Sequence, residues 1–238
     1  MLKLLAHITT SLLFPLDCET CGKSLSLSDR GICASCSNQI SWIKAPFCSI
    51  CSRPLTLNLS KCADCHHEHF YFRKAWAAAR YEGKMKELLQ AYKFSKRKSL
   101  HSFLGEALSK HFSTCMKNER FDFILPVPLP AEREKERGFN QARLLSSYLS
   151  SSLGISHAPQ FLKRNKSAQA QSLLTKKGRR INIRGCFYVE NSPFSGKDLL
   201  LIDDILTTGQ TASECSKVLL EAGAKSVSVL ACARGVKN

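Results

Sequence analysis

The hydrophobic pattern after residue 70 alternates between short apolar runs and longer amphipathic stretches. The runs with the length and apolarity of buried strands cover residues 74–82, 121–129, 198–203 and 226–233. The stretches with helical spacing of apolar residues cover residues 84–94, 99–117, 139–153 and 210–223. Apolar strands that alternate with helices predict an α/β fold, in which helices cover both faces of a parallel sheet.

The first 14 residues have an amphipathic pattern of their own. Leucine and isoleucine recur there at helical spacing, and polar residues such as His7 interrupt the apolar run that a signal peptide would need. We expect a helix over residues 1–14 that packs on the core or touches a membrane surface. No segment is long and apolar enough to cross a bilayer. We therefore expect a cytoplasmic protein, with a peripheral position at the inner membrane as an alternative.

Four Cys-x-x-Cys pairs follow, and they set residues 15–70 apart from residues 71–238. A gap of two residues lets one tight turn aim two thiolates at the same ion, and two such turns complete a tetrahedron around zinc. The pairs are Cys18 and Cys21, Cys33 and Cys36, Cys48 and Cys51, and Cys62 and Cys65. A disulfide framework would need an oxidising compartment, and a redox motif would be a single pair. We predict a small N-terminal double zinc ribbon with two structural zinc ions.

The spacing leaves the pairing of these turns open. Each zinc ion could bind two consecutive pairs, or the pairs could interleave, first with third and second with fourth. His66, His67 and His69 are possible substitute ligands, although eight cysteines already suffice. The other four cysteines are scattered, and we expect them to be small core residues.

The formal net charge of +16 adds a functional constraint. A surplus of basic residues suits partners that carry phosphate, which are nucleic acids or small phosphorylated molecules. Charge alone does not distinguish between the two.

The stretch "LLLIDDILTTGQT", residues 199–211, carries the clearest chemistry. Asp203 and Asp204 follow an apolar strand, and ligands of open α/β sheets bind at the carboxyl ends of the strands. The small residues after them lead into a helix N-terminus, where free backbone N–H groups and the helix dipole bind anions. We expect a sugar phosphate here, with its phosphate in the loop and its diol on the two acids, which should face solvent at the strand end.

This stretch resembles the phosphoribosyl-pyrophosphate (PRPP) motif of type I phosphoribosyltransferases. The resemblance implies a type I phosphoribosyltransferase-like sheet in which Asp203 and Asp204 are the catalytic acids that hold the ribose hydroxyls. It also implies that Mg²⁺ binds with PRPP, on the pyrophosphate and ribose oxygens. The residues that would wrap the 5′-phosphate are Thr207, Thr208, Gly209, Gln210 and Thr211.

Two further stretches, "PVPLPAEREKERGFNQA" and "QSLLTKKGRRINIRGCF", are similar to signatures of the ComF family of competence proteins. The double zinc ribbon is also typical of that family. The family implies a cytoplasmic factor of natural transformation that acts in the uptake or handling of single-stranded DNA, with the DNA-uptake machinery at the inner face of the membrane as a possible partner. The residues we assign to the pyrophosphate or to a flexible loop are Arg133, Arg137, Gln171, Arg179 and Arg180.

The segment between Leu162 and Phe187 carries eight Lys or Arg residues and no acid. Such a segment can neutralise a departing pyrophosphate, or it can follow a nucleic-acid backbone. We assign Lys163, Arg164 and Lys166 to nucleic acid. We favour a ComF-like DNA-uptake protein with a PRPP-binding pocket. The alternatives are an active phosphoribosyltransferase with an unidentified acceptor and, less favoured, a zinc-ribbon regulator.

Overall fold

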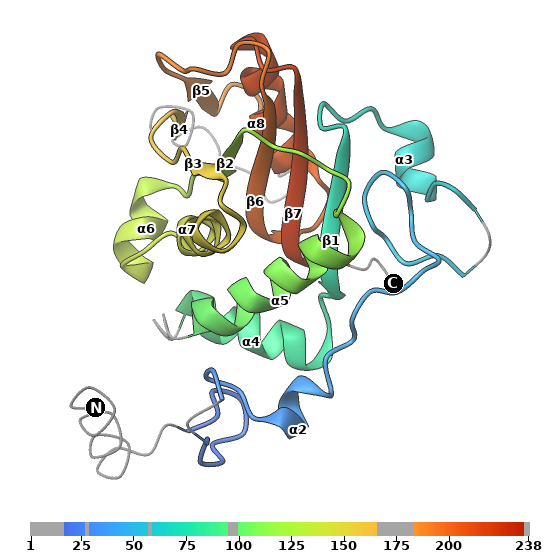
Figure 1. Ribbon diagram of the computed structural model, residues 1–238, viewed down its shortest axis with the longest axis vertical. Helices are drawn as coiled ribbons and strands as arrows, with labels where there is room; N and C mark the ends of the chain where they lie inside the picture. The colour runs from blue at the N-terminus through green and yellow to red at the C-terminus, as the bar shows by residue number, and fades with distance from the viewer. Residues whose placement is uncertain (1–16, 27–28, 57–58, 95–99, 166–182, 236–238) are drawn as a thin grey trace, which may run out of the picture.

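The computed structural model describes residues 17–26, 29–56, 59–94, 100–165 and 183–235. Its centre is a five-stranded sheet with the strand order β1-β7-β6-β2-β3 (Figure 1). The strands are β1 (Lys74–Arg80), β2 (Phe123–Pro126), β3 (Ser156–His157), β6 (Asp198–Leu206) and β7 (Ser226–Arg234). All neighbouring strands in this sheet are parallel. The predicted helix over residues 1–14 lies outside the described residues.

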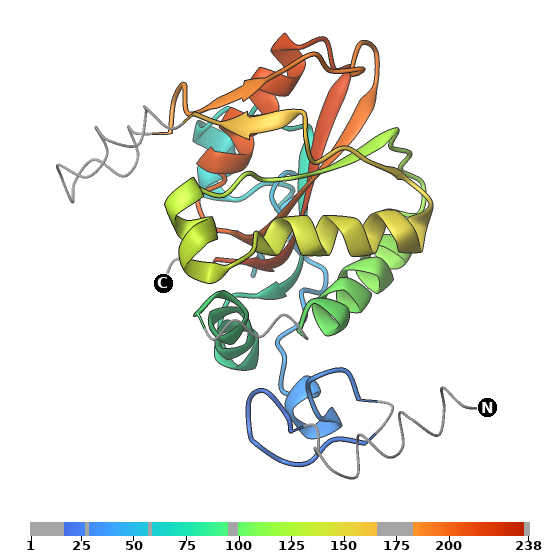
Figure 2. The same cartoon turned by 90° about the vertical axis from the view of Figure 1, so that its left-hand side faces the viewer.

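The side chains of β6 alternate between two apolar clusters on opposite faces of the sheet. Leu200 and Ile202 belong to one cluster, and Leu199 and Leu201 belong to the other. The helices on the first face are α4 (Gly83–Phe94), α5 (Leu100–Cys115) and α7 (Gln141–Leu153). The opposite face is covered by α8 (Gln210–Glu221) and by the antiparallel pair β4 (Leu162–Arg164) and β5 (Phe187–Val189) (Figures 1 and 2). The predicted parallel α/β fold with helices on both faces is confirmed.

Each of the four predicted helices is present, with ends that differ by at most a few residues. The sequence pattern did not predict α6 (Ala131–Arg137), because its seven residues are mostly charged and show no apolar face. This helix ends at Gly138, whose φ of 78° provides the left-handed conformation common at helix ends. The short strands β3, β4 and β5 were also missed, since two or three residues give no measurable alternation.

The edge of the sheet at β1 is covered by the cysteine-rich segment. The N–H of Ile43 donates to the Ala78 carbonyl at 2.9 Å, and the N–H of Ala75 donates to the Ile50 carbonyl at 2.7 Å. The exposed edge of a sheet is a template for unwanted pairing, so this cover protects β1. The segment also carries two short helices, α2 (Ala34–Ser37) and α3 (Ala63–His67), which lie well apart in Figure 1.

Within the described residues, no helix combines the length and the apolarity that crossing a bilayer requires.

Candidate functional site

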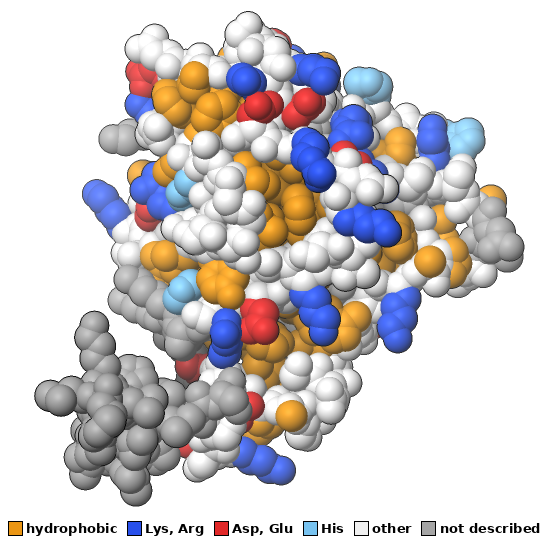
Figure 3. Space-filling view, in the orientation of Figure 1, with side chains coloured by type: hydrophobic (Ala, Val, Ile, Leu, Met, Phe, Trp, Pro, Cys, Tyr) orange, Lys and Arg blue, Asp and Glu red, His pale blue; other side chains and the backbone are white. Residues whose placement is uncertain are grey.

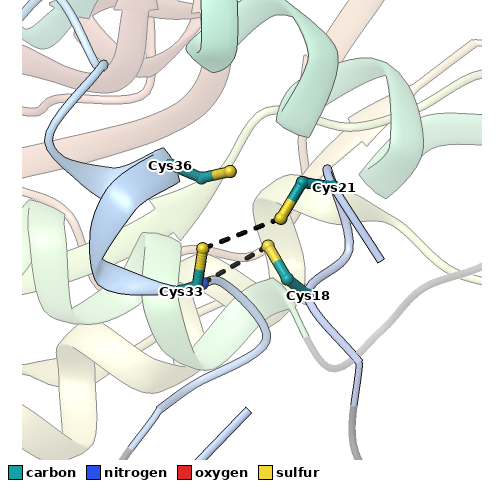
Figure 4. Close-up of side chains that lie close together, drawn as sticks. All are labelled: Cys18, Cys21, Cys33 and Cys36. Atoms are coloured by element: carbon teal, nitrogen blue, oxygen red, sulfur yellow. Dashed lines mark hydrogen bonds between the residues drawn. The ribbon is translucent and has the colours of Figure 1, made fainter. Parts of the chain in front are cut away.

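The first group of four cysteines is formed by Cys18, Cys21, Cys33 and Cys36. Their sulfur atoms all lie within 4.8 Å of one another and point toward a common centre (Figure 4). The Sγ atoms of Cys21 and Cys33 are 3.7 Å apart, and the N–H of Cys33 donates to the Cys18 sulfur at 3.3 Å. We call this group the first cysteine cluster.

The second cysteine cluster is formed by Cys48, Cys51, Cys62 and Cys65. Its four sulfur atoms also lie within 4.8 Å of one another, and all four cysteines are buried. A hydrogen bond with the Cys51 thiol lowers the pKa of Cys48 to about 4, and the same hydrogen bond raises the pKa of Cys51. Both clusters therefore combine consecutive pairs, and none of the three histidines considered as substitute ligands belongs to either cluster.

The geometry of both clusters fits zinc. A tetrahedron with zinc–sulfur bonds of about 2.3 Å has sulfur–sulfur edges of about 3.8 Å. The Cys21–Cys33 and Cys51–Cys62 sulfur distances are both 3.7 Å. A disulfide would need about 2.05 Å, and all of these cysteines are free. The prediction of two structural zinc sites is supported, with four thiolates for each ion.

The two predicted acids lie inside β6, close to the end that leads into the loop. Asp204 is only 9% exposed, and its Oδ2 forms an ion pair of 2.9 Å with Nζ of Lys93 from α4. The expectation that both acids face solvent is therefore wrong for Asp204, because α4 packs across the strand end. Asp203 is half-buried, and its Oδ1 accepts the N–H of Asp204 at 2.8 Å. Burial and the neighbouring Asp204 carboxylate raise the pKa of Asp203 to about 8.

Residues 207–211, which we call the 207–211 loop, comprise the turn after β6 and the first two residues of α8. Gly209 has a φ of 85°, which other residues rarely adopt. A Cβ atom placed there would also lie 3.2 Å from Cε1 of Phe70. Glycine is therefore required twice, by the backbone angle and by the close packing of an aromatic ring. The loop directs the N-terminus of α8 toward the end of β6, which is the predicted arrangement for an anion site.

A cavity of about 660 Å³ opens at this end of the sheet. It brings together residues that are distant in the sequence, and its walls combine cations and carboxylates. The lining residues that the sequence had singled out are Arg133, Arg137, Arg164, Asp203, Asp204, Thr207 and Thr211. Arg164, which we assigned to nucleic acid, thus lines the same cavity as the two aspartates. Thr208, Gly209 and Gln210 belong to the loop but do not line the cavity, and Lys163 lies outside it.

Other predicted residues cannot be placed. Lys166, Gln171, Arg179 and Arg180 lie outside the described residues.

Two buried nitrogen atoms belong to residues that line the same cavity as the aspartates. Arg137 is 7% exposed and donates through Nη1 to Oε1 of Gln141 at 3.1 Å. Its Nε and the Nε2 of Gln141 are buried and have no hydrogen-bond partner among the described residues. Buried donors normally find an acceptor. These two nitrogens therefore lack the acceptor that a buried donor normally has.

Sequence reasoning gave no role to several cavity residues, among them Tyr81, Lys93 and Gln141. Lys93 is one of several lysines in the basic helix α4, and only its pairing with Asp204 distinguishes it. Gln141 belongs to the "RGFNQA" stretch but was given no role. Tyr81 follows β1 and had no signal in the pattern.

Comparisons with known proteins identify relatives of this chain. Residues 9–66 match the model of the double zinc ribbon domain. Competence protein F of Haemophilus influenzae is 30% identical over 226 residues, which are 93% of this chain and 98% of the relative. Competence protein ComFC of Bacillus subtilis is 32% identical over 82% of this chain and 80% of its own length. The chain belongs to the ComF family. A further ComF relative, the DNA utilization protein YhgH of Escherichia coli K12, is 30% identical over 89% of this chain and 94% of its own length.

Solved structures resemble the ComF chain more distantly. A glutamine PRPP amidotransferase from Bacillus subtilis has a TM-score of 0.43 and 17% identity, and the match covers 60% of this chain and 30% of that one. Adenine phosphoribosyltransferase from Saccharomyces cerevisiae has a TM-score of 0.37 and 17% identity, over 58% of this chain and 72% of that one. At this distance the likeness does not extend to activity.

Proposed function

We propose that the cavity binds PRPP together with Mg²⁺, and that the protein serves natural transformation by handling single-stranded DNA. The observation that carries the first part is the composition of one cavity. Its lining combines the carboxylates of Asp203 and Asp204 with Arg137 and Gln141, which carry buried donors without a partner among the described residues. A ligand that carries both a diol and phosphates matches this combination, since a diol donates hydrogen bonds and a phosphate accepts them.

Each part of the ligand has a place in this assignment. The ribose hydroxyls donate to Asp203 and Asp204, and the 5′-phosphate accepts from backbone N–H groups of the 207–211 loop. The pyrophosphate lies toward Arg133 and Arg137, whose guanidinium groups bind phosphate oxygens in pairs. Mg²⁺ prefers oxygen ligands, and the carboxylate of Asp203 fits an ion held mainly by the ligand's own oxygens. When bound, the ion neutralises negative charge on the pyrophosphate.

The DNA part of the proposal rests on the family and on charge. The relatives are named as competence and DNA utilization proteins. Lys and Arg side chains are spread over the face shown in Figure 3 rather than gathered in one patch, which suits a partner bound through its phosphates without sequence preference. Arg164 of β4 lines the cavity, and Lys163 precedes it on the same strand. The reduced cysteines that the clusters require fit a cytoplasmic location.

A second candidate function is an active phosphoribosyltransferase. The four cations on the cavity wall, Lys93, Arg133, Arg137 and Arg164, favour it, because they can stabilise a departing pyrophosphate. No acceptor is identified by the described residues.

Calorimetric titration with PRPP and Mg²⁺ tests the pocket, and a pyrophosphate-release assay on the same samples tests turnover. We expect the wild type to bind. Asp203→Asn should weaken binding by about tenfold to a hundredfold, because it removes a carboxylate that accepts from the diol. Asp122→Asn is the matched control, since this exposed aspartate accepts the N–H of Asp198 at the opposite end of β6. Wild-type protein without binding heat would refute the pocket assignment. If the protein binds PRPP but releases no pyrophosphate with any candidate acceptor, the phosphoribosyltransferase function is ruled out.

The DNA assignment is tested by the salt dependence of binding to an unstructured oligonucleotide. Replacing Lys163 with Ala should reduce the log–log slope by about 0.7, the value for one phosphate contact on a single strand. The matched control is Lys197→Ala, because both lysines are exposed and pair with a carboxylate. Wild-type protein that does not bind at low salt would rule out direct DNA handling.

A further inference from the structure

A buried arginine connects the second cysteine cluster to the 207–211 loop. Arg234 ends β7, and only 1% of its surface is exposed. Its Nη1 donates to the carbonyl of Leu206 at 2.7 Å and also to the carbonyl of Thr207. Its Nε donates to the carbonyl of Cys51 at 3.1 Å. One guanidinium group thus holds the start of the loop and a zinc-ligand turn in fixed positions relative to each other.

The cluster also stabilises the buried positive charge of this arginine. A buried guanidinium is costly unless an opposite charge is nearby. Within the described part of the chain, Arg234 forms no ion pair with a carboxylate, while its Nη2 lies 3.6 Å from the Cys51 sulfur. A zinc ion bound by four thiolates has a net charge of about −2. The loaded cluster therefore supplies the counter-charge, and the arginine acts as an outer-shell partner of the metal.

The segment after Cys65 adds three contacts to the start of α8. Oε2 of Glu68 accepts from Nε2 of Gln210 at 2.9 Å, and the N–H of Tyr71 donates to Oγ of Ser213 at 3.0 Å. The ring of Phe70 packs against Gly209. These contacts join the segment after the second cluster to the loop and to the start of α8.

The first cysteine cluster has no such connection. Its buried members, Cys18 and Cys36, belong to the apolar cluster that includes α4 and α5. Among the described residues, no hydrogen bond joins residues 17–40 to residues 203–211.

We propose that Arg234 is a positioning residue, and that zinc in the second cysteine cluster sets the conformation of the 207–211 loop through it. The affinity for PRPP then depends on the second zinc ion and not on the first. This consequence for PRPP rests on the proposed function, whereas the conformation of the loop does not.

Hydrogen–deuterium exchange on the full chain tests the proposal. The variant Cys62→Ser/Cys65→Ser should lose one zinc ion, and the amides of the 207–211 loop should exchange at least about tenfold faster. The matched variant Cys18→Ser/Cys21→Ser should also lose one zinc ion, and its loop should exchange as in the wild type. Unchanged loop exchange after loss of the second zinc would overturn the proposal, and so would equal acceleration in both variants.

Two milder variants keep the test valid if the cysteine variants fail to fold. Arg234→Lys keeps the charge but cannot reach both sets of carbonyls, so loop exchange should rise while two zinc ions remain bound. Glu68→Ala should give a smaller increase of about twofold to fivefold. Normal exchange in Arg234→Lys would refute the role of the guanidinium.

Titration of the same proteins with PRPP and Mg²⁺ is a separate measurement. A wild type that fails to bind PRPP would refute the PRPP assignment alone. The exchange result would then still show whether the second zinc ion controls the conformation of the loop.

Discussion

The two cysteine clusters have nearly the same sequence pattern but different surroundings. Eleven residues separate the two pairs of the first cluster, and ten separate those of the second. In the first cluster Cys21 is exposed and Cys33 is half-buried, whereas the second cluster is buried completely. The first lies below α4 in Figure 1, and the second lies beside the β1 edge, with the segment after it hydrogen-bonded to α8.

The difference shows that ligand spacing predicts a metal site but not the part of the fold that the site supports. That part is decided by the residues between and after the ligands. In the first cluster Ile32 and Ile40 join the core of α4 and α5. In the second, Ile50 and Phe70 pack against the face of the sheet that carries α8. The same ribbon therefore stabilises a helical layer in one place and the edge of a cavity in the other.

Metal removal should give the largest contrast between the clusters. We expect two zinc ions per chain, and a strong chelator should remove the more exposed first zinc before the second. Cys62→Ser/Cys65→Ser should lower the melting temperature by about 10 °C or more, since losing a buried metal costs several kcal/mol. Cys18→Ser/Cys21→Ser should have a smaller effect. Zinc release followed with a colorimetric indicator, together with calorimetry, checks both statements. Release of both ions in one phase, with equal loss of stability, would remove the contrast.

The zinc ligands and the main elements could be predicted because their signals are local. A Cys-x-x-Cys turn and an apolar strand followed by a glycine-containing turn each lie within about 15 residues of sequence. The sequential pairing of the cysteines could not be predicted, because both pairings satisfy the same spacing.

The contacts that complete the cavity depend on packing between distant segments. Lys93 and Asp204 meet only because α4 lies across the end of β6, and no local pattern predicts that crossing. Arg234 appears in the sequence as a basic residue at the end of an apolar strand, with no sign that it is buried. The charged helix α6 was missed for the related reason that it lacks an apolar face.

Substitutions in the cavity should lower the stability of the protein without loss of zinc, unlike substitutions in either cluster. Asp204→Asn leaves the ammonium group of Lys93 largely buried without its counter-charge, so it should cost about 3 kcal/mol of stability, with both zinc ions retained. Asp203→Asn is the control, because Asp203 forms no such ion pair with the described residues and its charged form is disfavoured by burial, which raises its pKa. Chemical denaturation and zinc analysis of both variants give the comparison. Adding Lys93→Met to Asp204→Asn should recover part of the loss, and a double variant less stable than Asp204→Asn would contradict the pairing.

The pH dependence of stability should have opposite signs in the two regions. In the clusters, acid protonates the thiolates, so zinc and stability are lost as the pH falls. In the cavity, burial and the Asp204 carboxylate raise the pKa of Asp203 from 3.8 to about 8. The folded protein then binds one more proton than the unfolded chain between these values, so the contribution of Asp203 falls as the pH rises through this window.

The cavity effect is the smallest we predict, about 1 kcal/mol between pH 7 and pH 8. Denaturant titrations of the zinc-loaded wild type at these two pH values should show this loss, and Asp203→Asn should show a flatter dependence because it has no proton to release. Asp122→Asn should follow the wild type, since the pKa of Asp122 is lowered by its hydrogen bond with the Asp198 N–H and it is ionised throughout this range. Zinc content measured in the same samples separates the two regions, because loss of metal at pH 8 would assign the change to the clusters. If stability changes equally with pH in the wild type and in Asp203→Asn, and zinc is retained, Asp203 is already ionised at pH 7. The cavity and the clusters would then not have opposite pH dependences.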